Sequence, residues 1–152
     1  MEVLIDNRQS KIEISLEMIR RKAKAVLDAL DSPDGELSIL IVDDPQIAEF
    51  NKQYLNRKGP TNVIAFPMGA HTFSGQVPQL FGDVVISVET AQKEGSAAGI
   101  GLEERFIQLM VHGILHLFGY DHEKSEKEAV EMESKSNEIL RRISYGELNR
   151  QC

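Results

Sequence analysis

A largely apolar segment, residues 102–118, constrains the fold of this chain more than any other stretch. Its composition predicts a helix that is buried on most of its sides. After a charged first turn, the remaining polar side chains are Gln108, His112 and His116, which recur every four residues. Residues four apart share one face of a helix, so these three form a narrow polar stripe. A buried polar group costs roughly 1–3 kcal/mol unless it is paired, and the stripe therefore predicts a compensating partner.

Two further residues turn this stripe into a candidate metal site. Gly119 can adopt the left-handed conformation that ends a helix, and His122 completes the spacing H-x-x-x-H-x-x-G-x-x-H. Three imidazoles that leave a fourth position open are typical of catalytic zinc. We therefore expect one Zn²⁺ ion per chain, held by His112, His116 and His122, in a metal-dependent hydrolase. The alternative for each histidine is a hydrogen-bonded core residue.

The composition places this site in an ordinary globular protein. The 152 residues are 41% hydrophobic and 27% charged, which predicts a single domain over residues 1–152. No apolar run approaches the ~18–20 residues needed to cross a bilayer, so no membrane partner is expected. The first residues lack the basic and apolar regions of a secretory signal, and the single cysteine, Cys152, has no partner in the chain. These features predict a cytoplasmic protein without disulfides or a cysteine zinc site.

The charge is a second constraint on possible partners. A net charge of −7 argues against broad nonspecific binding of nucleic acid, which relies on neutralising many phosphates. Basic residues still cluster at positions 20–24 and again at Arg57 and Lys58. A solvated helix face is the simplest interpretation of the first cluster.

Hydrophobic periodicity and turn signals predict an α+β domain with a small mixed sheet. Asp44 is the expected N-cap of the second helix, with Pro45 at its first position, and Ser125 with Glu128 forms a capping box for the last helix. The segment from 67 to 80 is rich in glycine, serine and proline and is expected to form a loop that could shape a site. The predicted strands are 3–5, 12–14, 36–42, 62–66 and 83–88, and the predicted helices are 16–30, 44–55, 89–98, 102–118 and 125–143.

The histidine spacing matches the signature H-E-x-x-H-x-x-G-x-x-H of the metzincin metalloproteases. In that signature the glutamate is the general base that deprotonates the zinc-bound water. Here Gly113 takes its place. The sequence therefore argues against a peptidase, which is retained as an alternative only because of the spacing.

A fuller resemblance is to the YbeY family of bacterial endoribonucleases. Three blocks carry it, at residues 59–67 (GPTNVIAFP), 81–87 (FGDVVIS) and 112–122 (HGILHLFGYDH). They are similar, in the same order, to the family wordings P-T-D-V-L-S-F-P, L-G-D-I-x-I-S and H-G-x-L-H-L-x-G-Y-D-H. The resemblance spans residues 50–142, and its third block already has glycine where the proteases have glutamate.

The resemblance implies both a fold and an activity. The fold is α+β with a metzincin-like helix and turn, holding one zinc ion on the three histidines. The activity is a metal-dependent, single-strand-specific endoribonuclease that acts in ribosomal RNA maturation at the 3′ end of the small-subunit RNA and in ribosome quality control. The implied partners are single-stranded and ribosomal RNA, with the ribosome or ribosomal proteins. The oligomeric state stays open.

The resemblance also assigns residue roles, with one departure. The family has an arginine directly after a tyrosine, whereas here Leu55 follows Tyr54. The nearest arginine is Arg57, and we assign it the role of clamping the phosphate. Asp121 is expected to orient a histidine ring, or alternatively to hydrogen-bond within its own turn. The predicted catalytic residues are thus Arg57, His112 and Asp121.

Other residues of these blocks have structural alternatives. Thr61 and Asn62 are expected to fix the loop before a strand, with RNA contact as the alternative, and Asp83 is expected to be structural. Phe81 is expected in the core, although it could stack on a base, as could Phe73. His71 is expected to be exposed. A non-catalytic ribosome-assembly factor with a structural metal is the competing function, motivated by the missing base and the acidic charge.

Overall fold

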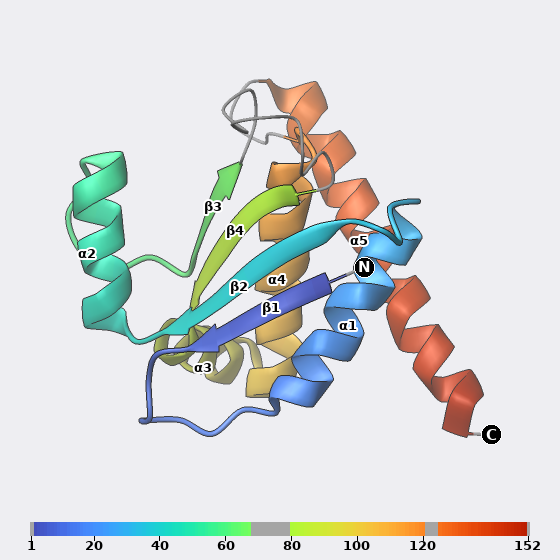
Figure 1. Cartoon of the computed structure of the whole chain (residues 1–152), viewed down its shortest axis with the longest axis horizontal. Helices are drawn as coiled ribbons and strands as arrows, with labels where there is room; N and C mark the ends of the chain where they lie inside the picture. Colours follow the sequence, from blue (N-terminus) through green and yellow to red (C-terminus); the bar gives the residue numbers. More distant parts are fainter. Residues whose placement is uncertain (1, 68–79, 121–124, 152) are drawn as a thin grey trace.

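The computed structural model describes residues 2–67, 80–120 and 125–151, and Figure 1 shows how its elements are arranged. Strands are concentrated in the first half of the chain and helices in the second, as expected for an α+β fold. The elements are β1 (Glu2–Asn7), α1 (Leu16–Ala29), β2 (Glu36–Val42), α2 (Asp44–Leu55), β3 (Val63–Pro67), β4 (Leu80–Ser87), α3 (Val88–Ala98), α4 (Leu102–Leu117) and α5 (Glu126–Gln151).

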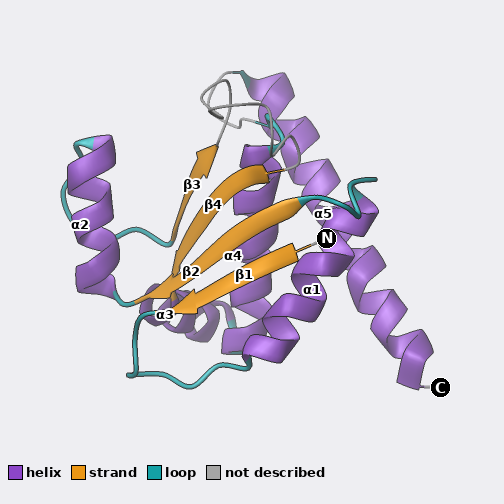
Figure 2. Ribbon diagram, viewed as in Figure 1, coloured by secondary structure: helices purple, strands orange, loops and turns teal. Residues whose placement is uncertain are grey.

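The four strands form one mixed sheet in the order β1-β2-β4-β3. Strands β1, β2 and β4 are parallel, whereas β3 runs antiparallel to β4. Figure 2 shows the sheet with its helices around it. The predicted α+β class with a small mixed sheet is therefore confirmed.

The sheet buries both of its faces, but to different extents. Side chains alternate between faces along a strand, so Leu37, Ile39 and Ile41 of β2 face the main core while Val42 joins a smaller one. Helices α1, α3, α4 and α5, with residues of β1 and β4, supply the rest of the main core, and Figure 1 shows α4 running behind the sheet. Helix α2 covers the smaller core, where Ile47 meets β3 and β4.

The predicted buried helix is confirmed as α4. Phe106, Met110, Ile114 and Leu115 are fully buried on it, whereas Gln108, His112 and His116 are half-buried. The polar stripe therefore lies along the side of α4 that retains access to solvent. In the described part of the chain, no helix is both long and apolar enough to cross a bilayer.

The strand predicted at residues 12–14 is wrong. The backbone N–H and carbonyl of Ile12 pair with the side-chain amide of Gln9, at 3.0 and 2.9 Å. A side chain thus satisfies the backbone groups that a neighbouring strand would otherwise bind. Ile12 and Ile14 still pack against the main core, which is the origin of their apolar alternation.

Several element boundaries also differ from the prediction. The N-cap of α2 is Asp43, not Asp44, and it forms a reciprocal capping box with Gln46. Strand β4 begins at Leu80, three residues earlier than expected, and α5 continues from the expected end near Ile143 to Gln151. The first turn of α5 has the predicted bond from the Glu128 N–H to Ser125 Oγ, at 3.1 Å. Of the predicted loop at 67–80, Pro67 belongs to β3 and Leu80 to β4, and residues 68–79 lie outside the described residues.

Candidate functional site

Helix α4 brings His112 and His116 together. Their Nε2 atoms are 3.1 Å apart, and their ring centroids are separated by 4.7 Å at an interplanar angle of 75°. Two nitrogens bound tetrahedrally to one zinc ion, each at about 2.0–2.1 Å, would lie about 3.3 Å apart. The observed separation is close to that value, so the pair fits the first two positions of a zinc site. It is also a suitable distance for an N–H···N hydrogen bond between the rings.

The end of α4 has the glycine turn that the sequence predicts. Gly119 has a φ of 96°, its N–H bonds to the His116 carbonyl, and the Tyr120 N–H bonds to the Leu115 carbonyl. These two bonds form a Schellman motif, in which a left-handed glycine reverses the chain direction. The turn therefore directs the chain back immediately after the second histidine.

Two predicted site residues follow this turn directly. His122 and Asp121 lie outside the described residues, as do His71 and Phe73. Within the ranges that the structure describes, no group of three histidine, cysteine, aspartate or glutamate side chains is arranged to hold a metal ion. The three-histidine site and the role of Asp121 therefore stay predictions.

Gly113 lies between the two histidines in the sequence but faces the sheet. A Cβ atom built on it would be 2.6 Å from Val84 Cγ1 and 3.2 Å from Val63 Cγ2. Real Cβ atoms do not approach other atoms this closely, so α4 can pack here only because residue 113 has no side chain. A glutamate at this position would have to displace β4. The packing thus gives a second reason, besides the missing carboxylate, why this helix does not suit a metzincin peptidase.

Arg57 lies in the exposed loop after α2. Its backbone N–H bonds to the Asn51 carbonyl, which ends the helix at the left-handed residue Asn56. Figure 1 shows α2 at the opposite edge of the molecule from α5, and no hydrogen bond, ion pair or ring contact between Arg57 and the two histidines of α4 is observed in the described structure. Its predicted catalytic role stays a prediction.

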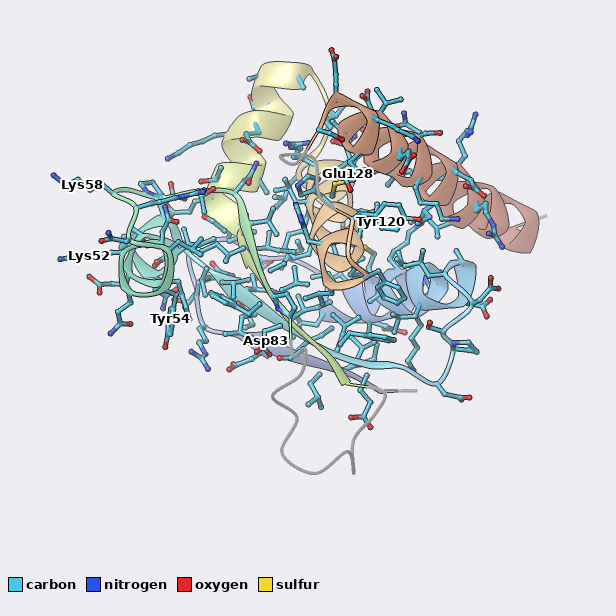
Figure 3. All side chains as sticks on the ribbon, turned by 90° about the horizontal axis from the view of Figure 1, so that it is seen from above. Lys52, Tyr54, Lys58, Asp83, Tyr120 and Glu128 are labelled. Atoms are coloured by element: carbon cyan, nitrogen blue, oxygen red, sulfur yellow. The ribbon has the colours of Figure 1, made fainter. Side chains whose placement is uncertain are left out.

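Aromatic and basic side chains are exposed on α2 and on the loop that follows it. Tyr54 is 63% exposed, and its ring contacts Phe66 edge-on at 5.4 Å and Phe50 at 6.0 Å. Lys52 and Lys58 are exposed on the same part of the chain, and Figure 3 shows both at the outer edge of α2. We call this set the α2 surface. Exposed aromatic rings beside cations are the elements from which single-strand binding surfaces are built.

The loop that enters β3 is tied to α3 and α4 through Glu94. The Asn62 side-chain amide donates to both carboxylate oxygens of Glu94, at 3.3 and 3.4 Å, and accepts from the Val63 N–H at 2.7 Å. The Arg105 Nε and Nη2 atoms donate to the same carboxylate at 3.1 and 3.0 Å. The loop-fixing role predicted for Asn62 therefore has a direct structural basis.

A polar cavity of about 350 Å³ opens beside this cluster and is lined by His112. Gln108, on the same helix face, accepts a bond from Arg105 Nη1 at 2.8 Å, and Asn137 of α5 lines the cavity opposite. Glu94 and Asn137 were not among the predicted site residues. Their chain positions are far from the histidine motif, and no spacing pattern connects them to it.

Phe81 and Asp83, two further residues of the predicted blocks, lie in or beside the sheet. Phe81 packs on Phe118 with ring centroids 4.4 Å apart and fills the space beside Gly35, which supports its predicted core position. Asp83 is half-buried in β4, where its backbone pairs with that of Phe66. A second cavity, of about 340 Å³, lies at the turn after α4 and is lined by Tyr120 and Glu128, which Figure 3 shows between α4 and α5.

A separate charged cluster joins the start of α2 to α3. Desolvation acts to raise the pKa of Asp44, but hydrogen bonds from Ser87, Thr90 and Lys93 outweigh it and hold that pKa below its usual value. The Lys93 Nζ lies 2.9 Å from the Asp44 carboxylate, which raises the pKa of that lysine. All of these partners are satisfied within the cluster, so it stabilises the fold rather than forming a site.

Comparison with known proteins connects this arrangement to one family. The family model described as "Endoribonuclease YbeY" matches residues 4–144. A protein named endoribonuclease YbeY from Geobacter sulfurreducens is 44% identical over 97% of this chain and 99% of its own length. Another of that name, from Aquifex aeolicus, is 41% identical over 88% of this chain and 87% of its own.

A solved structure shows the same fold. The solution structure of TM1509 from Thermotoga maritima superposes with a TM-score of 0.67 and covers 98% of this chain and 93% of its own, at 24% sequence identity. The sequence matches cover nearly the whole chain, including the helix with the two histidines and the glycine turn that follows it. The chain therefore belongs to the YbeY endoribonuclease family.

Proposed function

We propose that this chain is a metal-dependent endoribonuclease that cleaves single-stranded RNA during the maturation of ribosomal RNA in the cytoplasm. The observation that carries the proposal is the His112–His116 pair on α4, followed by a glycine turn, in a member of the YbeY family. Relatives named endoribonuclease match almost the full length of the chain, which supports the nuclease activity. We further propose that residues 1–152 act as one domain and that the target is the 3′ end of the small-subunit RNA.

The metal in this proposal is one zinc ion held by His112, His116 and His122. The 3.1 Å separation of the first two Nε2 atoms supports it, because both can reach one ion without rearrangement. The Schellman turn supports the third ligand, because it reverses the chain just before His122. Such an ion would supply Lewis acidity toward a phosphate oxygen and would lower the pKa of water to about 7.

The protein's own groups are proposed to position the RNA. His112 and His116 would hold the metal ion beside the phosphate that is cut, and Asp121 would hold a histidine ring in orientation. Arg57 would clamp a phosphate with its planar guanidinium. Tyr54, Lys52 and Lys58 of the α2 surface would guide the strand toward it. Because the net charge is −7, RNA must meet a local basic surface rather than the molecule as a whole.

The test is cleavage of matched single-stranded and duplex fragments of ribosomal RNA by the purified protein. The single strand should be cut and the duplex spared, and a chelator or His116→Ala should abolish cutting. His71→Ala is the matched control, since it removes a histidine outside the motif and should retain activity. Unchanged cleavage by His116→Ala would show that the activity belongs to a contaminant or to another site.

Arg57 has its own test within the same assay. Arg57→Ala should lower kcat by about 10²-fold or more if the guanidinium contacts the reacting phosphate, and Arg57→Lys should recover only part of this loss, since an ammonium cannot bind bidentately. Lys24→Ala, which removes an exposed cation from α1, is the control. Wild-type kcat in Arg57→Ala would remove this residue from the catalytic set.

A non-catalytic ribosome-assembly factor is the second candidate. It is favoured by Gly113, which leaves the helix without the base of the peptidase signature. In this case the metal would only stabilise the fold, and the ribosome or ribosomal proteins would be the partners. Full rescue of rRNA processing by His116→Ala in a deletion strain would support it, whereas failure of rescue by a folded variant would support the nuclease.

A further inference from the structure

The polar cavity beside His112 is larger than a metal ion alone requires. It lies among α4, α5 and the loop before β3, and its volume is about 350 Å³. Pockets for small organic ligands start at about 300 Å³. His112 is part of its wall, so a group bound in the cavity would be next to the proposed metal ion.

The walls of the cavity combine neutral polar groups with apolar ones. Gln108 and Asn137 contribute side-chain amides from two different helices, and Ser136 adds a hydroxyl. Leu109 and Leu140 contribute apolar surface. Amides and hydroxyls can both donate and accept hydrogen bonds. The cavity therefore suits a flat ligand with an apolar face and an edge that carries donors and acceptors.

The Arg105 guanidinium that lines the cavity is already engaged. Both Nε and Nη2 of Arg105 are bonded to the Glu94 carboxylate, and Nη1 donates to Gln108 Oε1 at 2.8 Å. The guanidinium charge is thus compensated by Glu94. The bond from Nη1 also fixes which atom of the Gln108 amide faces Arg105, so the amide is held in one orientation. With its charge compensated by Glu94, Arg105 offers a phosphate little attraction, which favours a neutral ligand at this wall of the cavity.

We propose that this cavity binds one unpaired nucleobase of the substrate RNA, adjacent to the phosphate that is cut. The base would pack on Leu109 and Leu140 and present its edge to the amides of Gln108 and Asn137. Single-stranded RNA is read in this way, because only unpaired bases expose their hydrogen-bonding edges. The inference rests on the proposed nuclease function and adds to it a position at which base identity is read.

The first test measures sequence preference during cleavage. Single-stranded RNAs with randomised positions are cut, and the cut ends are sequenced. The wild type should prefer certain bases at one position beside the cut, and Asn137→Leu and Gln108→Met should each reduce that preference about tenfold. Ser134→Leu places the same side chain on an exposed part of α5 outside the cavity and should keep the preference.

The outcomes of this test separate a base from a phosphate in the cavity. If both variants lose the preference for particular bases beside the cut while the overall cleavage rate changes less, the cavity recognises a base. A uniform loss of affinity for all sequences would mean that a phosphate binds there instead and would overturn the proposal. Retention of the wild-type preference in both variants would also overturn it.

The second test does not depend on cleavage. The four nucleosides are titrated into the full-length protein while NMR follows the side-chain amide signals of Gln108 and Asn137, assigned with the two variants. At least one nucleoside should shift both signals, and Asn137→Leu should weaken its binding about tenfold. If nucleosides shift these signals but RNA is not cut, the proposed nuclease function is wrong and the proposed base binding in the cavity is supported. If RNA is cut but no nucleoside shifts them and no position is preferred, the cavity proposal fails.

Discussion

Gly113 affects both the packing of α4 against the sheet and the chemistry that this helix can support. In the sequence, a glycine at position 113 argues against a peptidase, because a peptidase of this type needs a carboxylate there. In the structure, a Cβ atom on residue 113 would meet Val84 and Val63 of the sheet. The two histidines are half-buried on α4, whereas position 113 is buried against the sheet.

This contact predicts the effect of adding one methyl group. Gly113→Ala should lower the free energy of unfolding by about 1–2 kcal/mol, because overpacking outweighs the gain in helix propensity. The measurement is urea unfolding. Val84→Ala in the same molecule should recover part of the loss, since it removes the Cγ1 atom that the new Cβ would meet. A Gly113→Ala variant as stable as the wild type would mean that the contact is not tight.

Asn62 differs from the aspartate that the YbeY motif usually has at this place. Asn62→Asp would put a second carboxylate within about the 3.3–3.4 Å that now separate its amide from Glu94. The variant should lose about 1 kcal/mol at pH 7, because Arg105 offsets only part of the repulsion. The penalty should fade as the pH is lowered, because protonation of the introduced carboxylate removes the repulsion. Asn62→Ala removes the same hydrogen bonds without adding charge, and a similar pH dependence in both variants would contradict this account.

Elements were predicted best where the sequence signal is local. The strand at 36–42 and the helix at 102–117 follow from their apolar patterns. Residues 12–14 have the same kind of pattern but form no strand, because pairing depends on a distant partner and Gln9 occupies the backbone groups first. The end of α5 was placed too early because its apolar periodicity weakens after Ile143, although the helix continues.

The junction of α2 with α3 should be sensitive to acid. The folded state holds the pKa of Asp44 below its ordinary value of 3.8, so this carboxylate stabilises the fold above that pH. Its contribution is lost as the pH falls through the lowered folded pKa. Asp44→Asn should therefore cost about 1–2 kcal/mol at pH 7, and the difference from wild type should shrink below about pH 3.8 in unfolding experiments. Asp6→Asn, at an exposed ion pair with Arg8, should change little at any pH.

At the scale of the whole molecule, the order of the strands in the sheet determines which segments lie next to α3 and α4. Because β4 lies between β2 and β3, the strand-entry loop with Asn62 comes beside α3 and α4. The histidine pair could be predicted from spacing, since its four-residue separation is a property of one helix. The cavity could not, because Asn62, Gln108 and Asn137 come from three segments that only the tertiary fold brings together.

The central proposal is that one metal ion on the three histidines makes this fold a nuclease. The most direct measurement is reconstitution of the metal-free protein with zinc, while cleavage of single-stranded ribosomal RNA and bound metal are followed together. Activity should rise linearly and reach its maximum at one zinc per chain, and His116→Ala should neither bind the ion stoichiometrically nor cut. Full cleavage by the metal-free protein, or by His116→Ala, would contradict the proposal.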